Sequence, residues 1–165
     1  MNIHQFFDPK KTTELIGLQS YLLFFNELIL REKFPKVMLL SGEKGIGKST
    51  LINHLMSLIF DKKNYDVKKN LINENSIYYS QYQDNLFPNI INFKASNSKN
   101  ITVEDVRNLK DILSKTPINF GKRFIIIDDV ETLNANCLNG LLRIIEEPKK
   151  NDNFILINNN VTLKS

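Results

Sequence analysis

The sequence has almost no cysteine, no tryptophan and no apolar run long enough to cross a membrane. Cys137 is the only cysteine among 165 residues. A single cysteine can form neither an intramolecular disulfide nor a thiolate metal site, so the hydrophobic core must supply the stability. No apolar stretch approaches the roughly 20 residues that span a bilayer. The first residues also lack a basic segment followed by an apolar one, so we expect a cytoplasmic protein.

The residues that are present fit one globular domain. Hydrophobic residues make up 42% of the chain and charged residues 24%, which is the balance of a folded protein rather than a disordered one. A chain of 165 residues suffices for one domain and is short for two, so we expect one folded unit. The net charge of +4 allows a nucleic-acid partner, but AT-rich coding produces the same excess of lysine. Charge alone therefore identifies no partner.

Short apolar runs alternate with helical patterns along the chain. Each run is bounded by turn residues, which is typical of strands buried on both faces of a parallel sheet. Strands are predicted at 37–40, 90–93, 124–127 and 154–157. Helices are predicted within 12–31, over 50–60, from 102 to 115 and from 134 to 148. The alternation predicts an α/β fold with a mainly parallel sheet. The polar stretch 61–87 shows neither period, and we interpret it as an insertion outside the core.

A glycine-rich segment follows the first predicted strand at once and leads into a predicted helix. Its glycines let successive N–H groups point at phosphate oxygens, Lys48 can neutralise the β and γ phosphates, and Ser49 can offer a hydroxyl to magnesium. The positive end of the helix is directed at the same anion. We therefore predict ATP with Mg²⁺ here. The predicted nucleotide-binding residues of this segment are Gly42, Glu43, Lys44, Gly45, Ile46, Gly47, Lys48, Ser49 and Thr50.

Two carboxylates close the third predicted strand. A carboxylate at the end of a buried strand can reach the magnesium shell beside the phosphates, so we assign Asp128 to the metal together with Ser49. Asp129 lies where ATPases need a water-activating carboxylate, and it is one methylene shorter than glutamate. Asp129 and Glu131 are the candidate catalytic bases. Solvation of a strand end is the alternative role for these acids.

The other reactive side chains carry weaker signals. His4 and His54 have no ligand-spaced partners, so we predict no metal role for either. Cys137 is expected to be a partly buried helix residue. One stretch is rich in lysine and tyrosine. We interpret it as a solvent-exposed face, and a nucleic-acid-binding surface is the alternative. Its residues are Lys62, Lys63, Lys68, Lys69, Tyr65, Tyr78, Tyr79 and Tyr82.

Two further segments resemble the clamp-loader subunits of bacterial DNA polymerase III, which belong to the AAA+ class. Residues 127–134 read Ile-Asp-Asp-Val-Glu-Thr-Leu-Asn, and residues 139–148 read Asn-Gly-Leu-Leu-Arg-Ile-Ile-Glu-Glu-Pro. The family carries an acidic strand end followed by a helix reading Asn-Ala-Leu-Leu-Lys-x-Leu-Glu-Glu-Pro, from which Gly140, Arg143 and Ile145 depart. The paired aspartates are most similar to those of the delta-prime type, because gamma-type subunits show Asp-Glu.

This resemblance implies an AAA+ P-loop NTPase of three layers. It also implies a hetero-oligomer with other clamp-loader subunits, in which ATP drives the loading of a sliding clamp onto primed DNA. The chain would then contact the DNA only indirectly, and it would have no membrane partner. Ile16 and Gly17 resemble the family's segment beside the adenine. The AAA+ order places strand 154–157 between 37–40 and 124–127, with 90–93 beyond and all four parallel. Asn158 or Asn159 would then sense the γ phosphate.

The sequence departs from the family's pattern in three ways. The zinc-binding cysteines of many relatives are absent, so we predict no zinc. The sequence given ends at Ser165. In relatives, the segment that supplies an arginine to a neighbour's ATP site lies beyond this point, as do the last strand, the lid and the collar. We therefore expect strand 37–40 to be a bare edge of the sheet. With Asp129 in place of glutamate, we expect weak or no ATPase activity from the chain alone. An ATP-binding stator with little turnover and a P-loop kinase are the alternatives.

Overall fold

The computed structural model describes most of the chain as two compact units. The described residues are 8–94, 101–118 and 121–160. Unit 1 is drawn from Met1–Phe34 and Gly45–Phe87, and unit 2 from Pro35–Lys44 and Pro88–Ser165. The chain passes from unit 2 to unit 1 between Lys44 and Gly45, inside the glycine-rich loop. The expectation of one nucleotide-binding domain stays a prediction.

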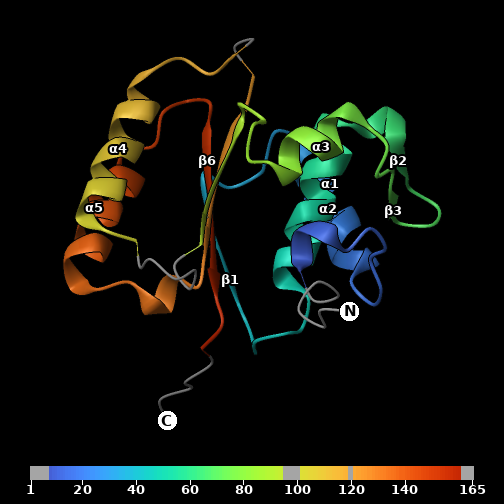
Figure 1. The fold of residues 1–165 in the computed structure, drawn as a ribbon, viewed down its shortest axis with the longest axis horizontal. Helices are drawn as coiled ribbons and strands as arrows, with labels where there is room; N and C mark the ends of the chain where they lie inside the picture. Colours follow the sequence, from blue (N-terminus) through green and yellow to red (C-terminus); the bar gives the residue numbers. More distant parts are fainter. Residues whose placement is uncertain (1–7, 95–100, 119–120, 161–165) are drawn as a thin grey trace. The chain divides into compact units, whose positions relative to one another are not determined.

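In its described residues, unit 2 is a four-stranded parallel sheet with two α-helices, α4 and α5, on one of its faces (Figure 1). The strand order is β1-β6-β5-β4, and each neighbouring pair is parallel. Right-handed crossovers through helices produce such a sheet. The elements are β1 (Val37–Ser41), β4 (Ile90–Lys94), α4 (Val103–Ser114), β5 (Arg123–Asp128), η5 (Val130–Thr132), α5 (Ala135–Glu146) and β6 (Asp152–Asn158).

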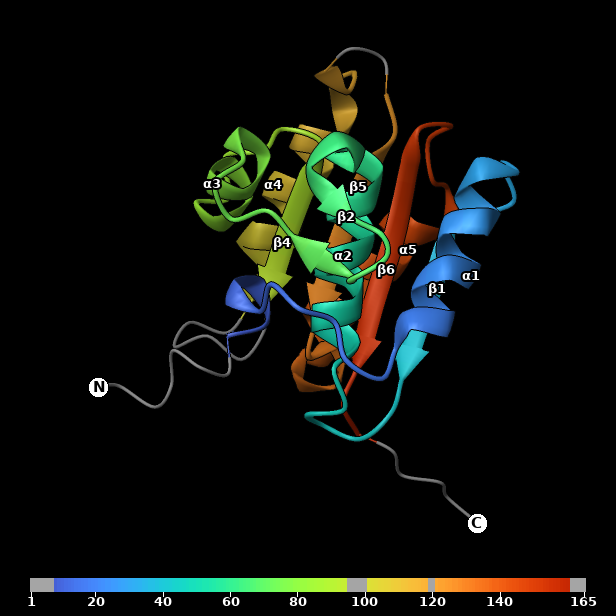
Figure 2. The same ribbon diagram turned by 90° about the vertical axis from the view of Figure 1, so that its right-hand side faces the viewer.

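The strand order agrees with the AAA+ prediction. β6 lies between β1 and β5, with β4 beyond β5 (Figure 2). In the register, Phe154 of β6 faces Val37 on one side and Ile125 on the other. β1 is an edge strand of the described sheet, as expected, and its Leu39 is 59% exposed. The predicted α/β fold with a mainly parallel sheet is confirmed.

The core of unit 2 forms where α4 and α5 lie against the sheet. Thr102 and Asp105 form a capping box at the start of α4, and Asn134 caps α5 by accepting the backbone N–H of Cys137 at 2.9 Å. These caps fix where each apolar stripe begins. Cys137 is fully buried rather than partly buried, and its thiol donates to the Ile101 carbonyl at 3.2 Å. The core residues are Ile101, Val106, Leu109, Leu113, Ile125, Ile127, Cys137, Leu141 and Phe154.

A buried ion pair ties the end of α4 to the start of two strands. Arg123 opens β5, and Asp152 opens β6 directly opposite it. The guanidinium donates to both carboxylate oxygens, at 2.9 and 3.0 Å. It also donates to the carbonyls of Ile112, Leu113 and Lys115, each at 3.2 Å. Arg123 therefore supplies donors to carbonyls at the C-terminal end of α4, where the helix itself offers few.

From residue 8 onward, unit 1 consists of three α-helices with short strands and turns (Figure 1). Only one α-helix forms within 12–31, because residues 13–15 instead run beside β3: Ile72 N–H donates to the Thr13 carbonyl, and Leu15 N–H to that of Asn70. No helix in the described ranges has both the length and the apolar character to cross a membrane. The elements are η2 (Pro9–Lys11), α1 (Gln19–Leu30), α2 (Lys48–Phe60), η3 (Lys62–Asn64), β2 (Tyr65–Asp66), β3 (Leu71–Ile72) and α3 (Ile77–Gln83).

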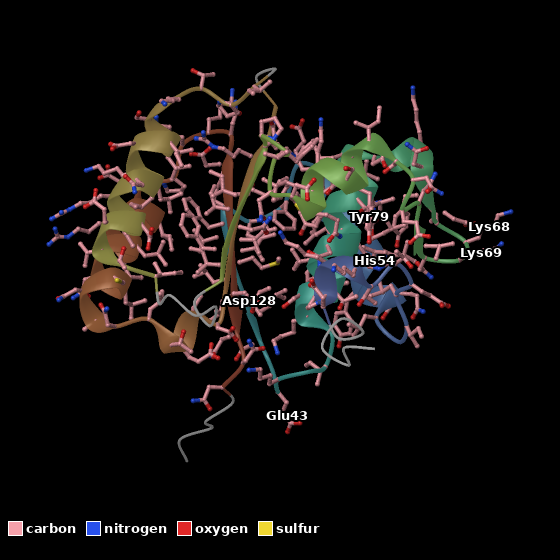
Figure 3. The ribbon with its side chains drawn as sticks, in the orientation of Figure 1. Glu43, His54, Lys68, Lys69, Tyr79 and Asp128 are labelled. Atoms are coloured by element: carbon pink, nitrogen blue, oxygen red, sulfur yellow. The ribbon has the colours of Figure 1, made fainter. Side chains whose placement is uncertain are left out.

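The expectation that residues 61–87 lie outside the core is wrong. Four of their side chains are at most 6% exposed, and the Tyr82 hydroxyl donates to Asn53 of α2. The segment's elements are too short to show a period, which is why its pattern was hidden. Its lysines are exposed, and Lys68 and Lys69 point outward from the β2–β3 hairpin (Figure 3). The buried residues are Tyr65, Ile72, Tyr78 and Tyr82, so three of the four tyrosines cannot stack on bases.

His54 is a fully buried residue of α2. Its Nε2 lies 3.2 Å from the Thr12 carbonyl, and its Nδ1 lies 3.0 Å from the Tyr65 hydroxyl. Because a carbonyl can only accept, Nε2 carries the proton and Tyr65 donates to Nδ1. Burial lowers the pKa of His54 from 6.5 to about 4, although the hydrogen bond to Thr12 raises it in part. His54 is therefore neutral at pH 7, and His4 lies outside the described residues.

Candidate nucleotide-binding site

Two glycines in left-handed backbone lead the chain into α2. Gly45 has a φ of 92° and Gly47 a φ of 93°, a region that side-chain-bearing residues rarely adopt. A Cβ on Gly47 would also lie 3.0 Å from Cδ1 of Leu18. The left-handed conformation therefore favours glycine at position 47, and a Cβ there would also crowd the Leu18 side chain.

The start of α2 has the features of an anion site. Gly47 is its N-cap, and no side chain caps the helix there. The N–H groups of a first turn have no partners within the helix, and the helix dipole favours negative charge beside them. Lys48, only 8% exposed, and half-buried Ser49 are the first two residues of α2. A phosphate group fits this combination of amides, cation and hydroxyl.

The predicted adenine segment lies beside this turn within unit 1. Ile16 is 78% exposed, and Gly17 has a φ of 78°. The next residue is Leu18, and its Cδ1 is the atom that would lie 3.0 Å from a Cβ on Gly47. Ile16 stands two residues before Leu18, and an exposed aliphatic side chain of this kind has the chemistry to contact a nucleoside base.

In unit 2, the carboxyl end of the sheet brings together other predicted residues. The Gly42 N–H donates to the Asn158 carbonyl at 3.2 Å, and the Asn158 amide lies 3.4 Å from the Ser41 hydroxyl. Glu43 and Asp128 lie at this same end of the sheet (Figure 3). Open α/β sheets bind ligands at the carboxyl ends of their strands.

The amide of Asn159 joins the acidic residues that follow β5. Its Nδ2 donates to Asp129 Oδ1 at 2.6 Å and lies 3.4 Å from Asp128 Oδ1. Its backbone N–H donates to Glu131 Oε2 at 3.1 Å. Asp129 is 4% exposed and has a left-handed backbone, with a φ of 57°. The end of β6 and the turn after β5 are thus held together by one asparagine.

These contacts give the acids different chemical surroundings. Asp128 is half-buried, while Glu131 is exposed and holds a backbone N–H. In the described part of the chain, no three His, Cys, Asp or Glu side chains are placed to hold a metal ion. A Mg²⁺ ion bound by proteins usually takes one or two carboxylates and completes its shell with phosphate oxygens and water.

Two contacts of the site were not predicted from the sequence. One is the contact of Leu18 with the loop, although Leu18 directly follows Gly17, a predicted site residue. The bridge from Asn159 to Asp129 joins residues far apart in the chain, and parallel strand order was the only signal that could have brought them together. Whether Asn158 or Asn159 senses a phosphate stays a prediction, as do the catalytic roles of Asp129 and Glu131.

Residues 18–163 match the model of a protein family described as "DNA polymerase III, delta subunit". The chain belongs to this family. The match covers the glycine-rich loop, the paired aspartates and the segment 139–148, so the resemblance that these residues carried is confirmed.

Curated relatives of the chain are also named as subunits of DNA polymerase III. The chain is 25% identical to DNA polymerase III subunit gamma of Buchnera aphidicola (subsp. Acyrthosiphon pisum), over 93% of this chain and 41% of the relative. It is 28% identical to subunit gamma/tau of Mycoplasma genitalium, over 87% and 23%. It is 27% identical to subunit delta' of Buchnera aphidicola (subsp. Baizongia pistaciae), over 73% and 37%. The chain thus spans well under half the length of each relative.

Proposed function

We propose that the chain is the nucleotide-binding part of a DNA polymerase III clamp-loader subunit, which helps to load a sliding clamp onto primed DNA during replication. In this role it binds ATP and Mg²⁺ on residues 42–49, in the cytoplasm, within a hetero-oligomer of clamp-loader subunits. Membership of the DNA polymerase III, delta subunit family supports the replication role.

The turn into α2 carries the nucleotide-binding part of the proposal. It joins two left-handed glycines to a helix start that has no side-chain cap and that carries Lys48 and Ser49. We assign Lys48 to the β and γ phosphates, and Ser49 and Asp128 to Mg²⁺, while Thr50 and Ile16 are further contacts. Bound Mg²⁺ would neutralise phosphate charge. The residues of the chain itself would bind and orient the triphosphate.

An ATP-binding stator with little turnover is the second candidate. It is favoured by the bond from Asn159 to Asp129, because this 2.6 Å hydrogen bond occupies one oxygen of a carboxylate that is only 4% exposed, which leaves little room for an attacking water beside it. The P-loop kinase alternative loses support, because the simplest kinases place the phosphate-loop strand next to the acidic strand. Here β6 separates β1 from β5.

Assembly with the other clamp-loader subunits of the source organism tests the proposal. Size-exclusion chromatography with light scattering would measure the mass of the mixture with ATP and Mg²⁺ and without them. We expect a hetero-oligomer that ATP favours and that a Lys48→Ala variant forms less readily. No co-assembly under any nucleotide condition would contradict the clamp-loader role. Assembly that neither ATP nor this substitution affects would contradict the role of the nucleotide.

A further inference from the structure

A groove of about 710 Å³ runs between α4 and α5 in unit 2. It follows both helices for most of their length, from Val103 to Ser114 on one side and from Asn136 to Lys149 on the other. The helices lie close together at Gly140, because a Cβ there would lie 3.1 Å from Cγ1 of Val106. None of the candidate nucleotide-binding residues lines this groove.

The floor of the groove is apolar and its rim is basic. Val106, Leu113 and Phe154 contribute buried side chains to the lining. Four cationic residues also line it: Arg107, Lys110, Arg143 and Lys149. The two lining carboxylates are Glu147 and Asp152, and the second is neutralised by its buried pair with Arg123. Positive charge therefore exceeds negative charge around an apolar floor.

Two of the four cations are already engaged. Arg107 lies 3.3 Å from Glu104 on the same helix. The Lys149 ammonium donates to the Ser114 carbonyl at 3.0 Å and so closes one end of the groove. Lys110 and Arg143 are exposed, one on each helix, and neither is in an ion pair with a described carboxylate. Their charges are available to a ligand that lies along the groove.

We propose that the α4–α5 groove binds a short acidic segment of a protein partner, with apolar side chains on the floor and carboxylates at Lys110 and Arg143. The volume fits a few side chains, and the charges on the two helices are complementary to an acidic chain between them. This inference is independent of nucleotide binding.

The lining favours a peptide over a nucleic acid. Phe154 is the only aromatic side chain among the described lining residues, and it is 1% exposed, so the groove has no surface on which bases could stack. A phosphate backbone would contact the two free cations but would gain nothing from the apolar floor. An acidic peptide with apolar side chains uses both features.

Fluorescence anisotropy with the full chain tests the proposal directly. The probe is a labelled short peptide of alternating aspartate and leucine. Matched peptides carry asparagine in place of aspartate or serine in place of leucine, and a labelled single-stranded DNA serves as a further ligand. We expect saturable binding of the first peptide, weakened by salt, and at least about fivefold weaker binding of each matched peptide.

Charge removal in the groove gives the decisive comparison. A Lys110→Ala/Arg143→Ala variant should bind the peptide at least about fivefold more weakly. Lys62→Ala/Lys63→Ala removes the same charge from exposed positions in unit 1 and should leave binding unchanged. The proposal is overturned if the peptide fails to bind, or if both variants bind it like the parent. Tighter binding of the DNA that depends on Lys110 and Arg143 would make the groove a nucleic-acid surface and would also overturn it.

Discussion

The side-chain amide of Asn159 donates a 2.6 Å hydrogen bond to the buried carboxylate of Asp129. This bond ties the residue after β6 to the residue after β5, two strands that are neighbours in the sheet. It supplies a donor to a carboxylate that is only 4% exposed. The carboxylate of Asp129 therefore has a structural role, as the acceptor of the hydrogen bond from Asn159.

Replacing Asn159 with alanine should lower the free energy of unfolding by about 1–3 kcal/mol, because a buried carboxylate then loses a donor. Urea unfolding measures the difference. Asn160→Ala is the matched control, since Asn160 is the exposed next residue, and its effect should stay within about 0.5 kcal/mol. Equal effects of the two substitutions would show that the bond to Asp129 contributes nothing to stability.

Arg123→Ala should destabilise the protein by about 3–5 kcal/mol, because it leaves the Asp152 charge buried without a partner. It also removes the donors that satisfy the last carbonyls of α4. Arg107→Ala breaks an ion pair whose side chains are 73% and 67% exposed, and should cost at most about 1 kcal/mol. Thermal and urea unfolding of both variants test this contrast, and a loss for Arg123→Ala as small as the control's would refute it.

Stability should fall as the pH is lowered from 6.5 to about 4, because His54 must remain neutral in the folded state. Its pKa is about 4 when folded and 6.5 in the unfolded reference, so the unfolded state binds more protons in this window and acid favours unfolding. The loss amounts to about 3 kcal/mol across the window. Urea unfolding as a function of pH measures it. His54→Gln should remove this part of the slope, and an identical slope in the variant would count against it.

ATP turnover by the isolated chain should be weak, well below about one per second, even with Mg²⁺ and primed DNA. The resemblance implies that the activating arginine comes from a neighbouring subunit, and Asp129 is both short and bound by Asn159. A coupled assay for released phosphate measures the rate. Turnover at ordinary enzyme rates by the purified chain would disprove the dependence on a neighbour.

The sequence predicted unit 2 better than unit 1 for a physical reason. Buried parallel strands are short apolar runs, and the caps at Thr102 and Asn134 mark helix starts by local chemistry. In residues 61–87, burial instead comes from tyrosines on elements too short to show a period. The sequence did not predict the ion pair of Arg123 and Asp152. Each charged residue stands at the start of an apolar run, and a charged residue there is also typical of an ordinary, unpaired strand end.

Part of the candidate site followed from residue order and part did not. Gly45, Gly47, Lys48 and Ser49 lie next to one another in the chain, so their shared role could be predicted directly. The strand order came from the family resemblance, and it is the strand order that brings Asn159 to Asp128 and Asp129. Which of several acids an amide will bind depends on turn geometry, which the sequence does not state.

Titration of a fluorescent ATP analogue against Lys48→Ala tests nucleotide binding on the loop most directly. Lys48 is the buried cation at the start of α2, whereas Lys44 is exposed in the same loop, so Lys44→Ala is the matched control. Loss of a charge-assisted contact of about 1.5–3 kcal/mol predicts roughly ten- to a hundredfold weaker binding by Lys48→Ala, with a much smaller effect of Lys44→Ala. Urea unfolding must show both variants folded. An affinity of folded Lys48→Ala equal to that of the parent would contradict the assignment of the loop as the nucleotide site.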